Sequence, residues 1–270
     1  MKRLSKLRKK TVGLALGSGA ARGLAHIGVL EVLEKEGIPV DMIAGTSMGA
    51  LIGAVYAQGK NANQIKDLAM ELGPKRFSLL ADPGLPKTGL VQGRKIKTVL
   101  KSLFGDIVFG DLRIPFACVA TDIETGEEVV IKQGLVREGV RASGSIPILL
   151  TAVKRQGRYL VDGALVNPVP TSVLREMGAD FIIAVSVAPS ISGELHQVEK
   201  EPNIFTIIMQ TVHIAAYQAL RSSLSGADVV IEPQVASIGP FDFHRTPECI
   251  LQGELATRDS ILEIKRRLAA

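Results

Sequence analysis

The sequence predicts an α/β fold with a mostly parallel sheet whose faces are covered by helices. Two apolar runs of strand length, 11–16 and 41–44, each lead into a glycine-containing turn and then into a segment with helical spacing. Strands that alternate with helices in this way are typical of parallel sheets. The chain has 270 residues, of which 46% are hydrophobic, so one domain with a sizeable core is expected.

The elements follow one another in order along the chain. Gly37 and Pro39 end the first helix, and the Thr125-Gly126 turn joins two strands into a hairpin. Frequent Gly and Pro over 73–93 predict a long irregular loop, of a length often found in lids. The expected strands are 11–16, 41–44, 115–121, 128–132, 158–161, 181–187 and 227–231. The expected helices are 22–36, 48–58, 136–142, about 203–224, and a last one from 247 towards 268.

The positive charge is concentrated at the N-terminus. The formal net charge is +5, and the basic residues Lys2, Arg3, Lys6, Arg8, Lys9 and Lys10 stand in the first ten positions without an acidic one. We therefore expect a basic tail over 1–10 and a single domain over 11–270. A solvated tail is the favoured interpretation, and attachment to an anionic membrane face is the alternative. The tail lacks the apolar core of a secretory signal, which predicts a cytoplasmic protein, peripheral at the inner membrane face if the tail attaches.

Composition argues against several other classes of protein. The uncharged stretches 42–59 and 202–220 are interrupted by Gly, Ser, Asn, Gln and His, so neither is expected to span a bilayer. Trp is absent and aromatic residues make up 4%, which argues against a base-stacking surface for nucleic acid. Cys118 and Cys249 lie far apart in apolar segments, which favours buried thiols over a disulfide. The chain has no H-E-x-x-H or C-x-x-C spacing, so we expect no metal.

The segment Gly45-Thr46-Ser47-Met48-Gly49 has the form of a nucleophile elbow. In such an elbow a serine sits on a sharp turn between a strand and a helix, and its hydroxyl is exposed. Gly45 and Gly49 stand two positions to either side of Ser47, where larger side chains would collide with the turn. The N-terminus of the following helix favours negative charge developing at Ser47. Ser47 is therefore the candidate nucleophile, and a purely structural turn is the alternative.

The segment Asp162-Gly163-Ala164 places a carboxylate directly after an expected strand. Within hydrogen-bond reach of Ser47, Asp162 would accept the hydroxyl proton during attack. The ordinary pKa of an aspartate, about 3.9, makes it a poor base for an alcohol, and burial would raise that pKa. The alternative is a turn aspartate that binds its own backbone.

A glycine-rich loop, Gly17-Ser18-Gly19-Ala20-Ala21-Arg22-Gly23, connects the first strand to the first helix. Free N–H groups at such a helix start, those of Gly19 and Ala20 above all, can converge on an oxyanion. Arg22 either anchors the loop or faces an anionic head group of a substrate. Together the three segments indicate a serine hydrolase.

The competing hypothesis is an NADP-binding oxidoreductase. Gly17, Gly19 and Gly23 approximate a dinucleotide fingerprint, and Asp41 would then bind the ribose. Tyr56 and Lys60 resemble a dehydrogenase pair, but they would lie only one helix beyond the loop, without room for a substrate site. The hydrolase hypothesis is therefore favoured.

The histidines decide between a triad and a dyad. His196, His213 and His244 follow Asp162 in the order found in α/β-hydrolases, whereas His26 lies in the first helix. None of them stands in a glycine-rich or strand-end context that would present it to Ser47. A dyad without histidine is therefore favoured.

The three segments, in this order, resemble the patatin-like phospholipases, especially the small bacterial members. The resemblance covers almost the whole chain and includes the segments 119–122, 141–147, 227–233 and 241–243. It implies a three-layer α/β/α sandwich, a structural role for Asp122 and Ser143, and no cofactor or metal. The site residues that it implies are the catalytic dyad Ser47 and Asp162, the oxyanion-hole loop Gly17, Ser18, Gly19, Ala20, Arg22 and Gly23, the elbow glycines Gly45 and Gly49, and the base motif residues Gly163 and Ala164. The loop of the family is usually richer in glycine, and here Ser18 and Ala20 stand at two positions where glycine is common.

The activity that the resemblance implies is hydrolysis of a fatty-acyl ester, such as a phospholipid or lysophospholipid, through an acyl-Ser47 intermediate. The segments 73–93 and 203–224 are expected to supply an apolar acyl pocket. The oxidoreductase stays open as an alternative, as does a non-catalytic membrane- or partner-binding protein with an idle dyad.

Overall fold

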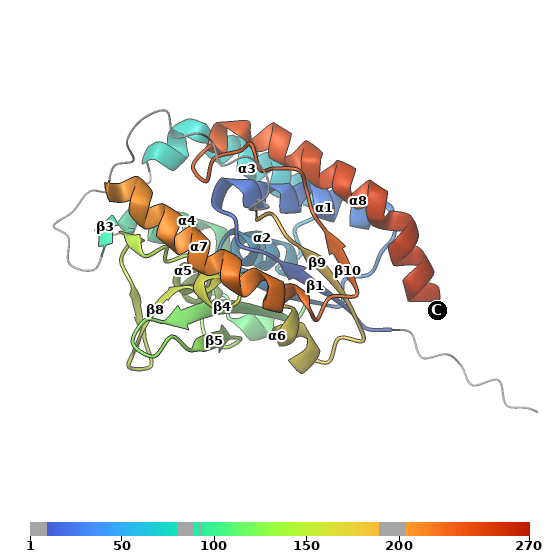
Figure 1. Ribbon diagram of the computed structural model, residues 1–270, viewed down its shortest axis with the longest axis horizontal. Coiled ribbons are helices and arrows are strands. Elements are labelled where there is room, and N and C mark those ends of the chain that lie inside the picture. The colour runs from blue at the N-terminus through green and yellow to red at the C-terminus, as the bar shows by residue number, and fades with distance from the viewer. Residues whose placement is uncertain (1–9, 80–88, 92, 189–203) are drawn as a thin grey trace, which may run out of the picture.

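The computed structural model describes residues 10–79, 89–91, 93–188 and 204–270, and a mixed eight-stranded sheet runs through its centre (Figure 1). The strands of this sheet are β1 (Val12–Leu16), β2 (Met42–Thr46), β4 (Phe116–Asp122), β5 (Glu128–Ile131), β7 (Val153–Arg155), β8 (Arg158–Asp162), β9 (Phe181–Val185) and β10 (Val229–Ile231). Their order is β10-β9-β1-β2-β4-β8-β7, and β5 also pairs with β4. The pairs from β10 to β4 are parallel, and β5, β7 and β8 join antiparallel. The two short strands β3 (Gly89–Val91) and β6 (Ile148–Leu150) pair in parallel outside this sheet.

Helices cover both faces of the sheet. They are α1 (Ala25–Lys35), α2 (Met48–Ala57), α3 (Ala62–Leu79), α4 (Arg94–Phe104), α5 (Val136–Ser143), α6 (Thr171–Glu176), α7 (Ile204–Leu224) and α8 (Thr246–Ala269). Short 3₁₀ turns are η1 (Ala20–Leu24), η2 (Phe109–Asp111), η3 (Gly163–Leu165) and η4 (Phe243–Arg245).

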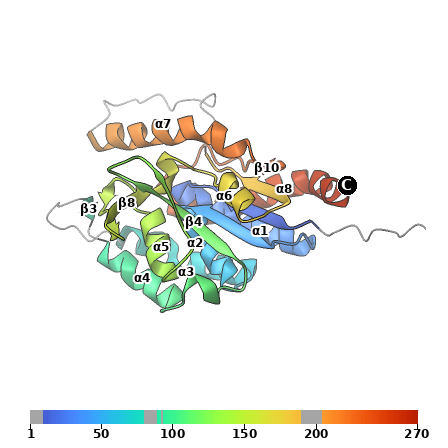
Figure 2. The ribbon, with the colours of Figure 1, turned by 90° about the horizontal axis from the view of Figure 1, so that it is seen from below.

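The core has two parts, one on each face, because side chains alternate across the strands. Val12, Leu14 and Leu16 of β1 pack against α1, α2 and α8. Ala15 faces the other way, into a smaller cluster that includes Leu174 of α6 and the partly buried Leu220 of α7. Figure 2 shows α7 on the side of the sheet opposite to α3, α4 and α5. The three-layer α/β/α fold and its mostly parallel sheet are therefore confirmed.

The seven strands expected from the sequence form, with ends within two residues of their expected positions. The expected helix over 22–36 starts as η1 and continues as α1. The irregular loop expected from residue 73 is wrong for 73–79, because α3 continues through Gly73 and Pro74 to Leu79. The N-terminal half of α3 buries Ile65 and Ala69 in the core, and such tertiary packing outweighs local helix-breaking residues. Residues 80–88 and 92 of that segment lie outside the described residues.

Three other expectations concern the termini, the thiols and the membrane. Of the basic tail, only Lys10 is among the described residues, and its ammonium group donates to the carbonyl of Arg267 at 2.7 Å. Cys118 and Cys249 are both free and buried, as expected. Within the described ranges, no helix combines the length and hydropathy needed to cross a membrane. That the chain forms a single domain stays a prediction.

The packing of α1 on α8 depends on two glycines that face each other. A Cβ atom at Gly253 would overlap with the carbonyl oxygen of Ala25, and one at Gly28 with that of Ile250. We expect Gly253→Ala to lower the free energy of unfolding by roughly 1–3 kcal/mol, because the helices would have to move apart. Urea denaturation measures this change, with Gly110→Ala as the control, since nothing lies within 4 Å of a Cβ there. Equal stability of the two variants would contradict this packing.

Candidate active site

The register of three strands brings Ser47 and Asp162 together. Thr46, the last residue of β2, lies opposite Val119 of β4. The next residue of β4, Ala120, lies opposite Asp162 at the end of β8. Both candidate residues therefore leave the sheet at adjacent positions along the same central strand, although 115 residues separate them in the sequence.

The turn at Ser47 is the strained elbow that the sequence predicts. Ser47 has φ 57° and ψ −118°, a backbone conformation that residues other than glycine rarely adopt. A Cβ at Gly45 would lie 2.6 Å from the carbonyl oxygen of Gly49, and a Cβ at Gly49 would overlap with that of Leu16. The small residues are therefore needed here for the close approach of strand and helix.

The two side chains form a direct hydrogen bond. The Ser47 Oγ donates to Asp162 Oδ2 at 2.6 Å, and the other carboxylate oxygen accepts from the backbone N–H of Ala164 at 2.9 Å. Asp162 is only 4% exposed. Burial raises its pKa to about 6, and the hydrogen bonds from Ser47 and Ala164 oppose that rise. The carboxylate is thus ionised at neutral pH yet more basic than an ordinary aspartate.

The C-terminal end of α5 and the residues directly after it hold both of these residues by their backbones. The N–H of Ser47 donates to the buried Ser143 Oγ at 2.9 Å, and the N–H of Asp162 donates to the carbonyl of Ser145 at 2.9 Å. The guanidinium group of the buried Arg141 donates in turn to Ser145 Oγ at 2.5 Å. The resemblance assigned Ser143 a general structural role. Its contact with the nucleophile could not be found from the sequence, since only the tertiary structure brings residues 143 and 47 together.

The glycine-rich loop is anchored on both sides of Gly19 and Ala20. The N–H of Gly17 donates to the carbonyl of Val185 at 3.0 Å, and that of Ser18 to Pro168 at 2.9 Å. Further on, the N–H of Ala21 donates to Pro240 at 3.1 Å, and that of Arg22 to Gly19 at 3.0 Å.

The N–H groups of Gly19 and Ala20, by contrast, have no hydrogen-bond partner among the residues that the structure describes. Ala20 has φ 48°, a left-handed conformation that turns the peptide groups on its two sides. The loop lies against the elbow, because a Cβ at Gly23 would come within 2.5 Å of the Met48 side chain. The loop that carries these two donors therefore lies against the elbow of Ser47.

The Arg22 side chain is bound to a segment outside the loop. Its Nε donates to the carbonyl of Ile238 at 2.5 Å, and its guanidinium group is partly buried near Asp242. This contact ties the loop to the 238–242 segment, the anchoring role considered above.

The prediction that Asp41 binds the ribose of a dinucleotide is wrong. Asp41 precedes β2, and its Oδ2 accepts from the N–H of Val12 at 2.8 Å, at the start of β1. The glycine-rich loop follows the C-terminal end of β1. Asp41 and the loop therefore lie at opposite ends of the parallel strands. Tyr56 interacts with Glu34, and burial first and then this neighbour raise the pKa of its phenol to about 12. Tyr56 is therefore bound to Glu34 and does not serve the glycine-rich loop as half of a dehydrogenase pair.

The histidines that the structure describes stay away from Asp162. His244 is exposed, and His26 is buried on α1. His196 and the side chain of His213 lie outside the described residues. In the described ranges, no group of three or more His, Cys, Asp and Glu side chains is arranged to hold a metal.

More than half of the chain matches the model of a known protein family. The sequence profile described as patatin-like phospholipase matches residues 14–175, which include both Ser47 and Asp162. The chain belongs to this family.

Curated relatives agree with that assignment. An uncharacterised NTE family protein of Mycobacterium tuberculosis is 36% identical over 193 residues, covering 72% of this chain and 53% of the relative. The human patatin-like phospholipase domain-containing protein 6 is 38% identical over 196 residues, covering 70% of this chain and 14% of the relative. The lysophospholipase NTE1 of Scheffersomyces stipitis is 30% identical over 266 residues, or 90% of this chain and 17% of the relative. The chain thus spans about half the length of the mycobacterial relative.

Among solved structures, VipD of Legionella pneumophila shares the fold. It matches with a TM-score of 0.53 and 13% identity, over 93% of this chain and 66% of that one.

Proposed function

We propose that this patatin-like phospholipase family member is a lipid acyl hydrolase with a Ser47–Asp162 dyad. The observation that carries the proposal is the 2.6 Å hydrogen bond from the hydroxyl of Ser47, at a strained elbow, to a buried carboxylate. Relatives of the chain are named as a phospholipase-domain protein and a lysophospholipase, which supports a fatty-acyl ester as the substrate.

The chemistry begins with attack of Ser47 Oγ on the acyl carbonyl carbon. Asp162 accepts the hydroxyl proton as the C–O bond forms, and the free N–H groups of Gly19 and Ala20 stabilise the oxyanion. When the tetrahedral intermediate collapses, the ester bond to the leaving alcohol breaks, and Asp162 returns the proton to that alcohol. Water then attacks the acyl-Ser47 ester with Asp162 again as base, which releases the fatty acid and restores the hydroxyl.

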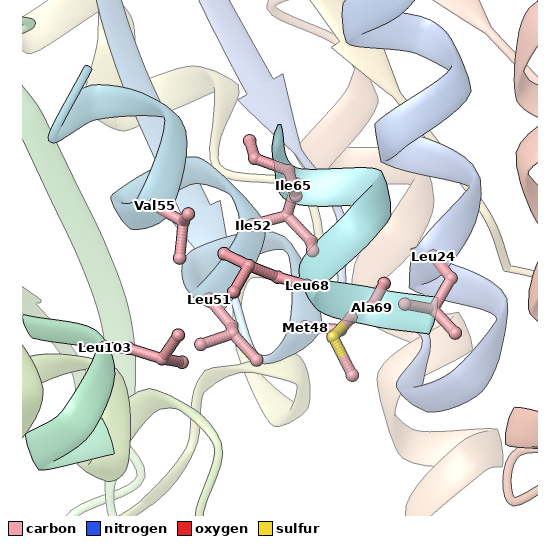
Figure 3. Close-up of a pocket in the computed structure, with 9 residues that line it drawn as sticks. All are labelled: Leu24, Met48, Leu51, Ile52, Val55, Ile65, Leu68, Ala69 and Leu103. Atoms are coloured by element: carbon pink, nitrogen blue, oxygen red, sulfur yellow. The ribbon is translucent and has the colours of Figure 1, made fainter. Parts of the chain in front are cut away.

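A small apolar cavity of about 40 Å³ lies next to the elbow, with room for a few atoms at the end of an acyl chain (Figure 3). Met48, directly after the nucleophile, lines it, and Leu51, Ile52 and Val55 continue the same face of α2. The other lining residues are Leu24 of η1, Ile65, Leu68 and Ala69 of α3, and Leu103 of α4. The described lining of this cavity thus comes from η1, α2, α3 and α4. That the segments 73–93 and 203–224 also line an acyl pocket stays a prediction, since much of both lies outside the described residues. Apolar lining of this kind gives chain-length preference through the hydrophobic effect.

We expect Leu103→Trp to shift the substrate preference towards short acyl chains. Leu103 and Leu24 lie at opposite sides of the cavity in Figure 3, so a bulkier residue at 103 shortens it. The kcat/KM for p-nitrophenyl laurate should fall roughly tenfold relative to the butyrate ester, since each methylene group in an apolar pocket contributes about 1 kcal/mol. Leu262→Trp, on the exposed face of α8, is the matched control. An unchanged ratio in folded Leu103→Trp protein would place the acyl chain elsewhere.

The first test of the proposal is covalent labelling with a fluorophosphonate probe followed by intact-mass analysis. We expect one adduct that maps to Ser47, is absent in Ser47→Ala, and forms much more slowly in Asp162→Asn. The absence of an adduct on folded wild-type protein would favour the non-catalytic alternative. Contact of the basic tail with an anionic membrane face and a cytoplasmic location stay predictions.

A further inference from the structure

His26 is a buried polar side chain beside the glycine-rich loop that the proposed mechanism does not use. It lies in the first turn of α1, it is fully buried, and its Nε2 is 2.7 Å from the carbonyl oxygen of Gly17. A carbonyl oxygen only accepts hydrogen bonds, so Nε2 must be the protonated ring nitrogen. Nδ1 then carries the lone pair, and in the described part of the chain it has no partner.

This ring is unsuited to proton transfer with the dyad. Both oxygens of the Asp162 carboxylate are already engaged, by Ser47 and by Ala164. Burial lowers the pKa of His26 to about 4, so the imidazole is neutral at physiological pH. A neutral ring with its only N–H committed to a backbone carbonyl acts as a fixed donor.

The carbonyl that it holds belongs to the residue where the glycine-rich loop leaves β1. The Gly17 carbonyl group and the Ser18 N–H belong to the same peptide unit, whose two ends bond to His26 and to the carbonyl of Pro168. The orientation of this peptide sets the direction in which the chain enters Gly19. It thereby sets where the free N–H groups of Gly19 and Ala20 point.

We propose that His26 is a positioning residue that orients the oxyanion-hole loop through the Gly17 carbonyl. The proposal rests on the proposed hydrolase function and deepens it. Without the imidazole donor, the Gly17–Ser18 peptide would be held at one end only. The strained conformation at Ala20 would then relax, and the donors beside Ser47 would lose their alignment.

Three substitutions separate this role from simple packing. His26→Gln keeps an N–H donor at about the reach of Nε2, His26→Asn keeps a polar amide that is too short, and His26→Phe keeps the ring shape without a donor. We expect kcat for a p-nitrophenyl ester to fall about 10–100-fold in the Phe and Asn variants, with KM within about threefold of wild type. His26→Gln should restore kcat to within about fivefold of wild type. His244→Gln, at an exposed histidine, is the control and should equal wild type.

The kinetic results distinguish a positioning role of His26 from a role in packing alone. A kcat in His26→Asn equal to that of wild type would overturn the inference, and so would equal losses in the Gln and Asn variants that follow their melting temperatures. If His26→Phe does not fold, the Gln and Asn pair still decides, because both are polar amides. The ¹⁵N chemical shifts of the imidazole give a readout independent of activity: Nε2 should be protonated and Nδ1 not. Absence of Ser47-dependent hydrolysis in wild type and His244→Gln alike would instead reject the proposed function itself.

Discussion

Ser47→Ala is expected to lower kcat for hydrolysis of a lipid or p-nitrophenyl ester by at least about 10³-fold, because the nucleophile is lost while the fold is retained. Alanine removes the Oγ that donates to Asp162 at 2.6 Å, and in the described part of the chain no other hydroxyl donates to that carboxylate. The residual rate should reflect the oxyanion donors and the substrate pocket alone.

The control for this variant is Ser222→Ala, at an exposed serine on α7, which should leave kcat unchanged. Initial rates on vesicles and on a soluble ester measure both variants. Lipid binding without hydrolysis, equal in wild type and Ser47→Ala, would instead support a non-catalytic lipid-binding protein.

Asp162→Asn is expected to lower kcat by roughly 10²–10⁴-fold, since an amide cannot accept the hydroxyl proton. The wild-type rate should itself depend on pH. Burial raises the pKa of Asp162 to about 6, so kcat/KM should fall as the pH drops through about 6 and the base becomes protonated. Asp259→Asn, at an exposed residue of α8, serves as the control and should keep the wild-type profile. A midpoint near 4, the ordinary range of an aspartate, would show that burial does not raise the pKa of Asp162.

The same raised pKa predicts a stability cost of the active site. Because the folded pKa of about 6 lies above the ordinary 3.8, the folded state binds more protons between these values, and stability falls as the pH rises through them. The cost is absent below pH 3.8 and complete above about pH 6. Two pKa units correspond to about 3 kcal/mol as an upper bound.

Asp162→Asn should therefore be more stable than wild type at pH 8, by up to about 3 kcal/mol, and the difference should shrink towards pH 4. Urea denaturation at several pH values measures this difference. Lower stability of the Asn variant at every pH would mean that the hydrogen bonds of Asp162 contribute more to the free energy of unfolding than the burial of its charge costs. Loss of activity together with a gain in stability is the outcome that the buried, functional carboxylate predicts.

The sequence by itself determined the layers of the fold and the two residues of the proposed dyad. Strands such as 11–16 and 181–187 are short, largely apolar runs, and such local patterns do not depend on the rest of the chain. The elbow at Ser47 can be predicted from its own neighbours, because only small residues such as Gly45 and Gly49 fit on either side of the turn. The helix through Gly73 and Pro74 was not predicted because these local residues disfavour it, whereas burial of its first half in the core stabilises it.

The tertiary structure alone decided how the candidate site is held and where an apolar cavity lies beside it. The register of β4 places Ser47 beside Asp162, and burial of that carboxylate raises its pKa. The contacts of Ser143 with the Ser47 backbone and of His26 with Gly17 join residues that no local spacing relates. The cavity lies between helices whose packing angles follow from the whole core. Local sequence specifies conformation through steric preferences within a few residues, whereas distances and desolvation depend on every layer that packs around the site.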